Sequence, residues 1–158
     1  MLRMNRKLLE MNREGKKLQV ALVGVGKMGR GLIAQMSRIP GMRPSVVVNR
    51  SVEKAKEAFL AAGAPLETLV ITDSLKRAKA ALEAGYFVIT EDYTIPLAIG
   101  EIAGVVDATG NTVFGAELAC AVIEAHKDLI MLNVETDAVI GPILYRKASE
   151  KGLIYTGS

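Results

Sequence analysis

Short apolar runs alternate with helical patterns along most of the chain, and this alternation predicts an α/β fold. The runs that we predict as strands are 18–23, 45–48, 69–72, 105–110, 129–133 and 153–156. The segments predicted as helices are 27–38, 52–62, 74–84, 113–125 and one from 139 or 142 to 151. Nearly continuous apolar strands are typical of a parallel sheet that is covered on both faces. We therefore predict a doubly wound parallel sheet with these six strands in the order 3-2-1-4-5-6.

A further strand-like run at 86–90 exceeds what this minimal arrangement needs, which suggests an elaboration between the third and fourth strands. Glu91 and Asp92 follow it directly. Two adjacent carboxylates could bind a metal ion or a polar substrate, and the alternative is a solvated loop. Asp92 is therefore a weak catalytic candidate.

Residues 1–16 form a separate amphipathic pattern before the first strand. Met1, Met4, Leu8 and Met11 share one stripe of a helix that ends at Gly15. Such a helix could bind a membrane surface or a partner protein, or it could dock on its own domain or on a second subunit. We prefer docking, and we divide the chain into an extension at 1–17 and one domain at 18–158.

A glycine motif, Gly-x-Gly-x-x-Gly, lies between the first strand and the first helix. Gly24 would allow a sharp turn, Gly26 a close approach of a pyrophosphate to the backbone, and Gly29 close packing of the helix on the strand. The helix start offers unpaired N–H groups to the phosphates. This context predicts a Rossmann dinucleotide site. Its expected phosphate-binding residues are Gly24, Val25, Gly26, Lys27, Met28 and Gly29.

The second strand ends in Asn49-Arg50-Ser51, at the distance from the glycines where NAD-binding domains carry an acid for the ribose hydroxyls. No carboxylate is present there, and a guanidinium can bind a 2′-phosphate through two parallel hydrogen bonds. We therefore expect NADP rather than NAD, although NAD stays possible. The alternative is a turn with a solvated arginine. Ser51 could also cap the next helix.

Two more strand ends reach the same edge of the predicted sheet. Small residues at Thr109 and Gly110, followed by Asn111, would let the nicotinamide ribose lie close to the backbone. Asn133 would face the ring or the substrate. Glu135 and Asp137 follow it, and they are the acids best placed near the ring, although only as weak catalytic candidates.

Composition narrows the setting of this predicted site. The single cysteine excludes an internal disulfide, and the chain has no stretch long and apolar enough for a membrane span. Residues 1–17 carry a net charge of +4 and the remainder −1, so the body gives little support to nucleic-acid binding. We expect a cytoplasmic homo-oligomer that acts on a small molecule, without nucleic acid, membrane or metal.

Several segments resemble homoserine-dehydrogenase-like NAD(P)-binding oxidoreductases. These are the glycine motif, the strand end at 107–110 and the strand end at Asn133. The helix ending in Gly15-Lys16-Lys17, together with the segments 90–92 and 133–135, is similar to the subgroup that carries a C-terminal SAF domain and includes deoxyxylulose-phosphate-reductoisomerase-like enzymes. The resemblance covers nearly the whole chain and implies an N-terminal Rossmann domain.

Two departures from that group shape the functional expectation. Homoserine dehydrogenases have a lysine after the asparagine, whereas Val134 stands here. The group also continues into a substrate and dimerisation domain, so we expect this chain to lack a C-terminal catalytic domain and to be inactive alone. We expect the NADP(H)-binding domain of an oxidoreductase for a small hydroxy or keto compound. The alternatives are a nucleotide-sensing regulatory module and a domain that has lost its nucleotide and serves assembly.

Overall fold

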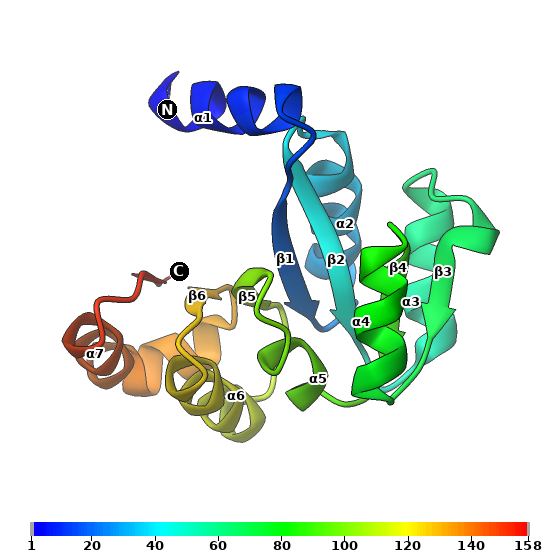
Figure 1. Ribbon diagram of the computed structural model, residues 1–158. Helices are drawn as coiled ribbons and strands as arrows, with labels where there is room; N and C mark the ends of the chain where they lie inside the picture. The colour runs from blue at the N-terminus through cyan, green and yellow to red at the C-terminus, as the bar shows by residue number, and fades with distance from the viewer. Residues whose placement is uncertain (1, 158) are drawn as a thin grey trace.

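A computed structural model describes residues 2–157, with side chains from residue 6 onward, and contains one seven-stranded sheet between helices (Figure 1). All of its strand pairings are parallel, in the order β3-β4-β2-β1-β5-β6-β7. The strands are β1 (Leu18–Val23), β2 (Met42–Val48), β3 (Leu69–Ile71), β4 (Phe87–Thr90), β5 (Ile102–Asp107), β6 (Asp128–Met131) and β7 (Tyr155–Thr156). The predicted fold class is therefore confirmed.

The helices are α1 (Leu2–Arg13), α2 (Lys27–Arg38), α3 (Val52–Ala61), α4 (Leu75–Glu83), α5 (Thr94–Leu97), α6 (Thr112–Glu124) and α7 (Val134–Glu150), with a 3₁₀ turn at Leu66–Thr68. Helices α2 and α3 cover one face of the sheet, and α4 to α7 cover the other. This division follows from right-handed crossovers, because connections that run in opposite directions along the sheet place their helices on opposite faces.

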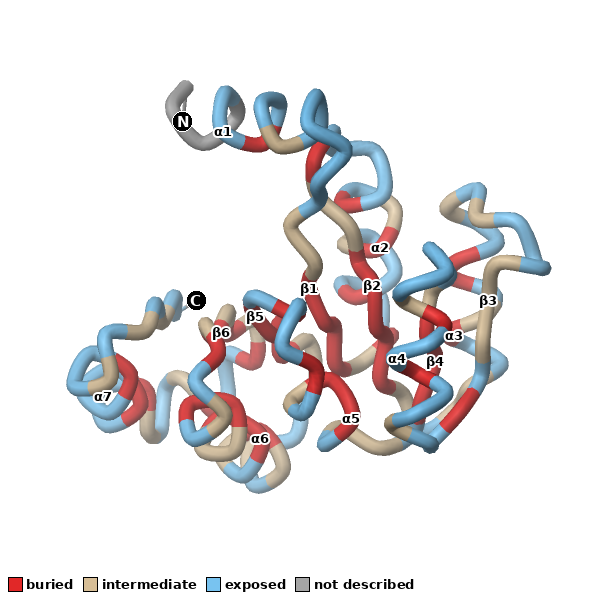
Figure 2. The backbone as a smooth tube through the Cα atoms, viewed as in Figure 1, coloured by how far each residue is buried: buried red, intermediate tan, exposed pale blue. Residues whose placement is uncertain are grey.

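Successive residues of each central strand enter different cores, as the alternation of a strand requires. Leu22 of β1 packs with Ile33 and Phe59 on one face, while Ala21 packs with Leu118 on the other. Figure 2 shows this buried layer running through the central strands beneath exposed helix faces. The scarcity of aromatic residues leaves both cores to be built mainly from aliphatic side chains.

The observed strand order corrects the predicted one. The additional run Phe87–Thr90 is β4 and pairs with β2, so the strand Leu69–Ile71 lies at the edge instead of beside β2. Burial explains the exchange, because three of the four β4 residues are buried, whereas no residue of β3 is. The more apolar run occupies the position that is covered on both faces.

Helix α7 begins earlier than predicted, at Val134 instead of 139 or 142. Asn133 caps it by accepting a hydrogen bond from the backbone N–H of Thr136, and Glu135 and Asp137 lie in the first turn. Acidic residues in a first turn favour a helix start electrostatically. Pro142 lies inside α7 and was a misleading boundary signal.

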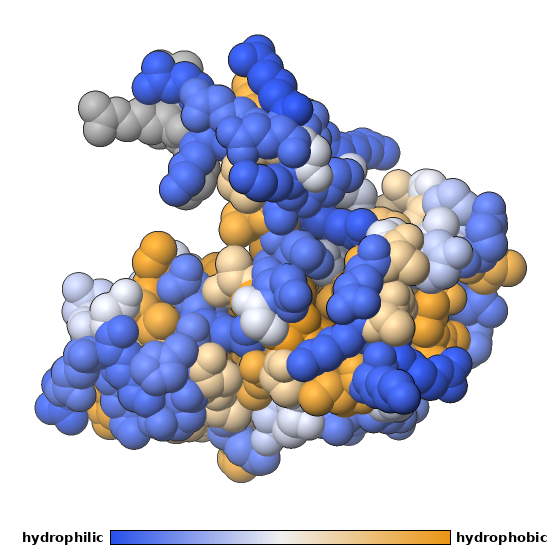
Figure 3. All heavy atoms as spheres, viewed as in Figure 1, coloured by the Kyte–Doolittle hydropathy of each residue, from blue (hydrophilic) through white to orange (hydrophobic). Residues whose placement is uncertain are grey.

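Helix α1 stands off from the sheet, near the turn between α2 and β2 (Figure 1). Its Leu8 is only 5% exposed, and the Leu8 carbonyl lies so close to Gly41 that a Cβ there would overlap it. Figure 3 shows mainly hydrophilic side chains on this helix. The helix thus docks on its own domain through one buried leucine. Met1 and the Met4 side chain of the predicted stripe lie outside the described residues.

Within residues 2–157, no helix combines the length and the apolar character that crossing a bilayer requires.

Candidate functional site

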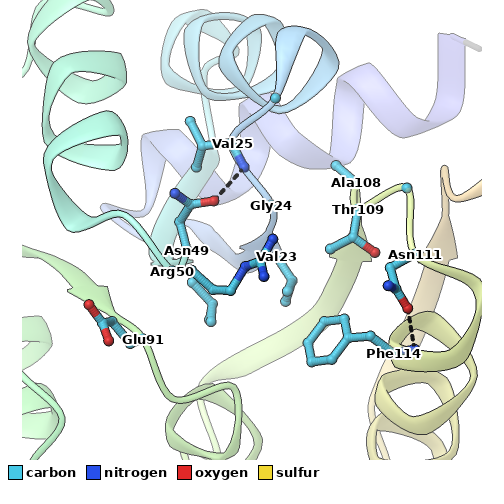
Figure 4. A pocket seen from close by; sticks show the side chains of 13 residues that line it. Val23, Gly24, Val25, Asn49, Arg50, Glu91, Ala108, Thr109, Asn111 and Phe114 are labelled. Carbon is cyan, nitrogen blue, oxygen red and sulfur yellow. Dashed lines mark hydrogen bonds between the residues drawn. The ribbon is translucent and has the colours of Figure 1, made fainter.

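A cavity of about 620 Å³ opens at the carboxyl edge of the sheet, between the ends of β1, β2 and β5 (Figure 4). The sheet order changes direction between β1 and β5, and ligands of doubly wound sheets bind at such a switch point. The volume lies within the range of ordinary ligand pockets. The lining residues are Val23, Gly24, Val25, Gly26, Val48, Asn49, Arg50, Glu91, Ala108, Thr109, Gly110, Asn111 and Phe114.

The glycine loop forms one wall of this cavity. Gly24 has a φ of +95°, and a Cβ at this position would lie 2.9 Å from the carbonyl carbon and oxygen of Ala108. A Cβ on Gly29 would overlap the Gly24 carbonyl oxygen, so α2 can pack here only with glycine. Gly26 differs, because nothing lies within 4 Å of its ideal Cβ position and it lines the open cavity.

Lys27 and Met28 are the first two residues of α2, and their side chains are exposed. Neither side chain lines the cavity. Gly26 is the N-cap of α2 and has no side chain to satisfy the first N–H groups of the helix. A helix start of this kind favours an anionic ligand.

Asn49 links the end of β2 to the glycine loop. Its Oδ1 accepts a hydrogen bond from the Val25 N–H (3.1 Å), and its Nδ2 donates to the Ser51 carbonyl (2.8 Å). Figure 4 shows the first of these bonds across the cavity wall. The Asn49 side chain therefore holds the loop in place, and it engages one of the loop amides expected to face a pyrophosphate.

Arg50 lines the cavity and is exposed, whereas Ser51 does not line it. The Ser51 hydroxyl caps α3 by accepting from the Lys54 N–H at 3.5 Å. Arg50 is thus the side chain of this segment that is available to a ligand. No ion pair involving it is formed with the other described residues.

Glu91 directly follows the neighbouring strand β4 and adds a carboxylate to the same wall. Its backbone N–H and the Thr90 hydroxyl both donate to Asp73, at 3.0 and 2.6 Å. The pKa of Asp73 is lowered from its ordinary value, first because of the Thr90 hydrogen bond and then the Glu91 one. These bonds fix the strand end from which Glu91 projects.

The opposite wall comes from the loop after β5. Thr109, Gly110 and Asn111 line it, and Asn111 caps α6 by accepting from the Phe114 N–H at 2.8 Å. Asn133 does not line the cavity, because it is completely buried behind this loop. Its influence on a ligand would have to pass through the loop.

Phe114 is a cavity-lining residue that sequence reasoning missed. It stacks edge-to-face on Tyr93, with ring centroids 5.6 Å apart. The available signal was its spacing, because the third residue after a helix-capping asparagine lies in the first turn, above the strand end.

The three acidic catalytic candidates lie elsewhere. Asp92 accepts hydrogen bonds from the N–H and hydroxyl of Thr94, Glu135 is exposed on α7, and Asp137 accepts from the Tyr155 hydroxyl. Burial and the Asp137 contact raise the pKa of Tyr155. None of these three acids lines the cavity. Across residues 2–157, no group of three or more His, Cys, Asp or Glu side chains is arranged to hold a metal ion.

Comparisons with known proteins find the fold but no close relative. No protein-family model matches the sequence, and no curated protein matches it. An NAD-binding protein from Listeria innocua is 22% identical with a TM-score of 0.60. A homoserine dehydrogenase from Thiobacillus denitrificans is 20% identical with a TM-score of 0.66. A 3-ketoreductase from Actinomadura kijaniata, in complex with NADP and TDP-benzene, is 16% identical with a TM-score of 0.63.

Each comparison covers 90% of this chain but only 34%, 29% and 38% of the other chain, in the order given. The chain therefore spans about a third of the length of these solved structures. At such identities the likeness shows the shared Rossmann-like fold. The neighbours are nicotinamide-dinucleotide proteins and oxidoreductases, and homoserine dehydrogenase is one kind among several.

Proposed function

We propose that the cavity binds NADP(H) and that the chain is the dinucleotide-binding part of an oxidoreductase. The observation that carries this proposal is the open cavity at the switch point, bounded by the glycine loop and the loop 109–111. The space in front of Gly26 matches what a pyrophosphate needs, because no side chain occupies the approach to the backbone.

In this proposal the pyrophosphate lies at Gly24–Gly29, against the start of α2. Arg50 holds the 2′-phosphate beside the adenosine ribose, with Asn49 and Ser51 shaping the backbone there. Thr109, Gly110 and Asn111 lie along the nicotinamide ribose. The bound cofactor would supply the hydride, while the residues of this chain bind and orient it.

The preference for NADP rests on the charge at the end of β2. Arg50 faces the cavity, and Asn49 stands where NAD-binding domains carry the ribose-binding acid. Glu91 lies on the same wall and adds negative charge, so the arginine must outweigh it for a 2′-phosphate to bind. We therefore expect a preference of several-fold, and not an absolute one.

We place the parent enzyme in the homoserine-dehydrogenase-like group, acting on a small hydroxy or keto compound. The segments 90–92 and 133–135 support the finer assignment to the subgroup with a SAF domain, including deoxyxylulose-phosphate-reductoisomerase-like enzymes. The likeness to a homoserine dehydrogenase from Thiobacillus denitrificans supports the wider group. Substrate-binding and catalytic residues would then come largely from outside this chain.

A fluorescence titration with NADPH and NADH tests the proposal. We expect saturable binding of both, with NADPH several-fold tighter and with Arg50→Ala narrowing the difference. Equal affinities for the wild-type protein would reject the role of Arg50. If neither dinucleotide binds at millimolar concentration, the proposed function itself is wrong.

A nucleotide-sensing module without catalysis is a second candidate. It is favoured by one observation, that Asp92, Glu135 and Asp137 do not line the cavity. The two candidates differ in the full-length gene product, which should reduce or oxidise a substrate only under the first. A sensing module would instead change conformation on binding the dinucleotide, with no turnover.

A further inference from the structure

A buried polar network lies directly behind the loop 109–111. Asp107 ends β5 and is completely buried, as are Asn133 and Thr136 at the start of α7. The Asp107 Oδ1 accepts from the Thr109 N–H (2.9 Å) and the Thr109 hydroxyl (2.7 Å), and its Oδ2 accepts from the Asn133 Nδ2 at 3.3 Å. The donors to this carboxylate therefore come from the cavity loop and from α7.

Asn133 ties the same loop at two points. Its Nδ2 lies 3.1 Å from the Thr109 hydroxyl oxygen and 3.1 Å from the Asn111 carbonyl oxygen, while its Oδ1 accepts from the Thr136 N–H. The loop is thus held on both sides of Gly110, which lines the cavity. A Cβ on Gly115 would overlap the side chains of this network, so α6 packs tightly over it.

The network also fixes the orientation of the Thr109 side chain. Its hydroxyl points inward, donating to Asp107 and accepting from Asn133, as Figure 4 shows for the direction of the oxygen. Its methyl carbon lies toward Gly24 on the cavity side, 3.1 Å from the ideal Cβ position of that glycine. The loop therefore presents a methyl group and backbone to the ligand, and keeps its hydroxyl for the interior.

Burying a carboxylate without hydrogen-bond donors costs free energy. Movement of the loop would remove the two Thr109 donors from Asp107, so this cost holds the loop in place. We propose that Asp107 and Asn133 are positioning residues that hold the loop 109–111 in the shape that receives the nicotinamide half of the dinucleotide. A preformed wall saves the ordering cost at binding. This inference rests on the proposed function, and it gives Asn133 an indirect role instead of a contact with the ring.

The test compares NADPH with 2′-phospho-ADP, which keeps the adenosine 2′-phosphate and the pyrophosphate but lacks the nicotinamide and its ribose, by isothermal titration calorimetry. For Asn133→Ala we expect NADPH affinity to fall about ten-fold, as for the loss of a buried hydrogen bond, with 2′-phospho-ADP binding unchanged. Thr136→Val is the matched control. It removes the hydrogen bond from the Thr136 hydroxyl to the Thr112 carbonyl in the same junction, but no contact to the loop. We expect it to lower the melting temperature and leave both affinities unchanged.

A second pair keeps the test decisive if Asn133→Ala does not fold. Thr109→Val preserves the size of the side chain but removes the hydroxyl. It should weaken the binding of NADPH and leave the binding of the shorter ligand unchanged. Thr109→Ser keeps the hydroxyl but loses the methyl group on the cavity side, and should bind NADPH more tightly than Thr109→Val does. The inference is overturned if Asn133→Ala and Thr109→Val bind NADPH with wild-type affinity, or if they weaken the binding of both ligands equally. Should the wild-type protein bind neither ligand, the proposed function fails, and the inference fails with it.

Discussion

At the scale of single residues, the adjacent Asn49 and Arg50 have different roles. The Asn49 amide is bonded to Val25 and Ser51, so it serves the protein, whereas Arg50 is open to the cavity. A residue pair at the right distance from a glycine motif predicts a cofactor preference. It cannot reveal that one member is already engaged with the backbone.

This arrangement predicts the effect of Asn49→Asp. The carboxylate can still accept from the Val25 N–H, but it places a negative charge where a 2′-phosphate would bind and cannot donate to Ser51. We expect NADPH affinity to fall by about ten-fold or more while NADH affinity is kept, because like charges repel strongly at a few ångströms. Parallel titrations with both cofactors measure this. An equal loss of both affinities would point instead to a damaged loop.

At the scale of elements, the glycine motif and α2 form one unit in which three glycines have different surroundings. Gly29 is packed against the Gly24 carbonyl, Gly26 faces the cavity, and Gly31 lies exposed within α2 with nothing near its Cβ position. The same change to alanine should therefore have different consequences at each position.

We expect Gly26→Ala to leave stability within about 0.5 kcal/mol, because its φ of −76° suits an alanine and no atom lies in the way. NADPH binding should be lost or strongly reduced, since the methyl group would fill the approach to the backbone. Gly31→Ala is the matched control, and should stabilise α2 by about 1 kcal/mol without affecting binding. Urea unfolding and NADPH titration of both variants measure this. Normal NADPH binding by Gly26→Ala would contradict the assignment of the loop.

Local sequence patterns determine the bounds of single elements but not the order of the strands in the sheet. Local patterns predicted Leu18–Val23 and Lys27–Arg38 with the bounds that the structure has. They could not place Phe87–Thr90 between β3 and β2, because strand order depends on which run buries more surface among distant elements. The sequence predicted that Asn133 faces the ring or the substrate, yet in the structure its side chain caps helix α7. Only the packing of α6 and α7 on the loop distinguishes the two roles.

Lys127 illustrates a feature with no sequence signal. It is 5% exposed, and its ammonium group donates to the carbonyls of Ile99 and Ile102 at 2.7 and 2.8 Å. Burial lowers its pKa from the ordinary lysine value. A lysine after a helix usually lies in solvent, so its burial follows from the path of the α5–β5 segment and not from local pattern.

At the scale of the whole molecule, α1 stands apart from the sheet and its covering helices (Figure 1). Its described contact with the rest of the chain centres on Leu8 over Gly41. This contact lies next to the start of β2, whereas the cavity lies at the carboxyl ends of the strands. The exposed apolar residue Leu9 lies beside it. The division of the chain into an extension at 1–17 and a domain that begins with β1 stays a prediction, which a shortened chain can test.

Removal of residues 1–14 should therefore separate stability from binding. We expect the free energy of unfolding to fall by about 1.5–3 kcal/mol, the contribution of one buried leucine side chain, with NADPH affinity unchanged. Chemical denaturation and titration of the shortened chain provide the readouts. A loss of binding on truncation would show that α1 supports the cavity. A loss of folding would show that it belongs to the domain.

The most direct measurement of the central claim is a titration of ¹⁵N-labelled protein with NADPH, followed by backbone amide chemical shifts. We expect the largest changes at Gly26 and Gly29, at Arg50 and at Gly110, in the segments that surround the cavity. Amides of α1 and β3, which contribute no residue to the lining of the cavity, should keep their chemical shifts. Saturation without shifts at the glycine loop, or no binding at all, would show that this cavity is not a dinucleotide site.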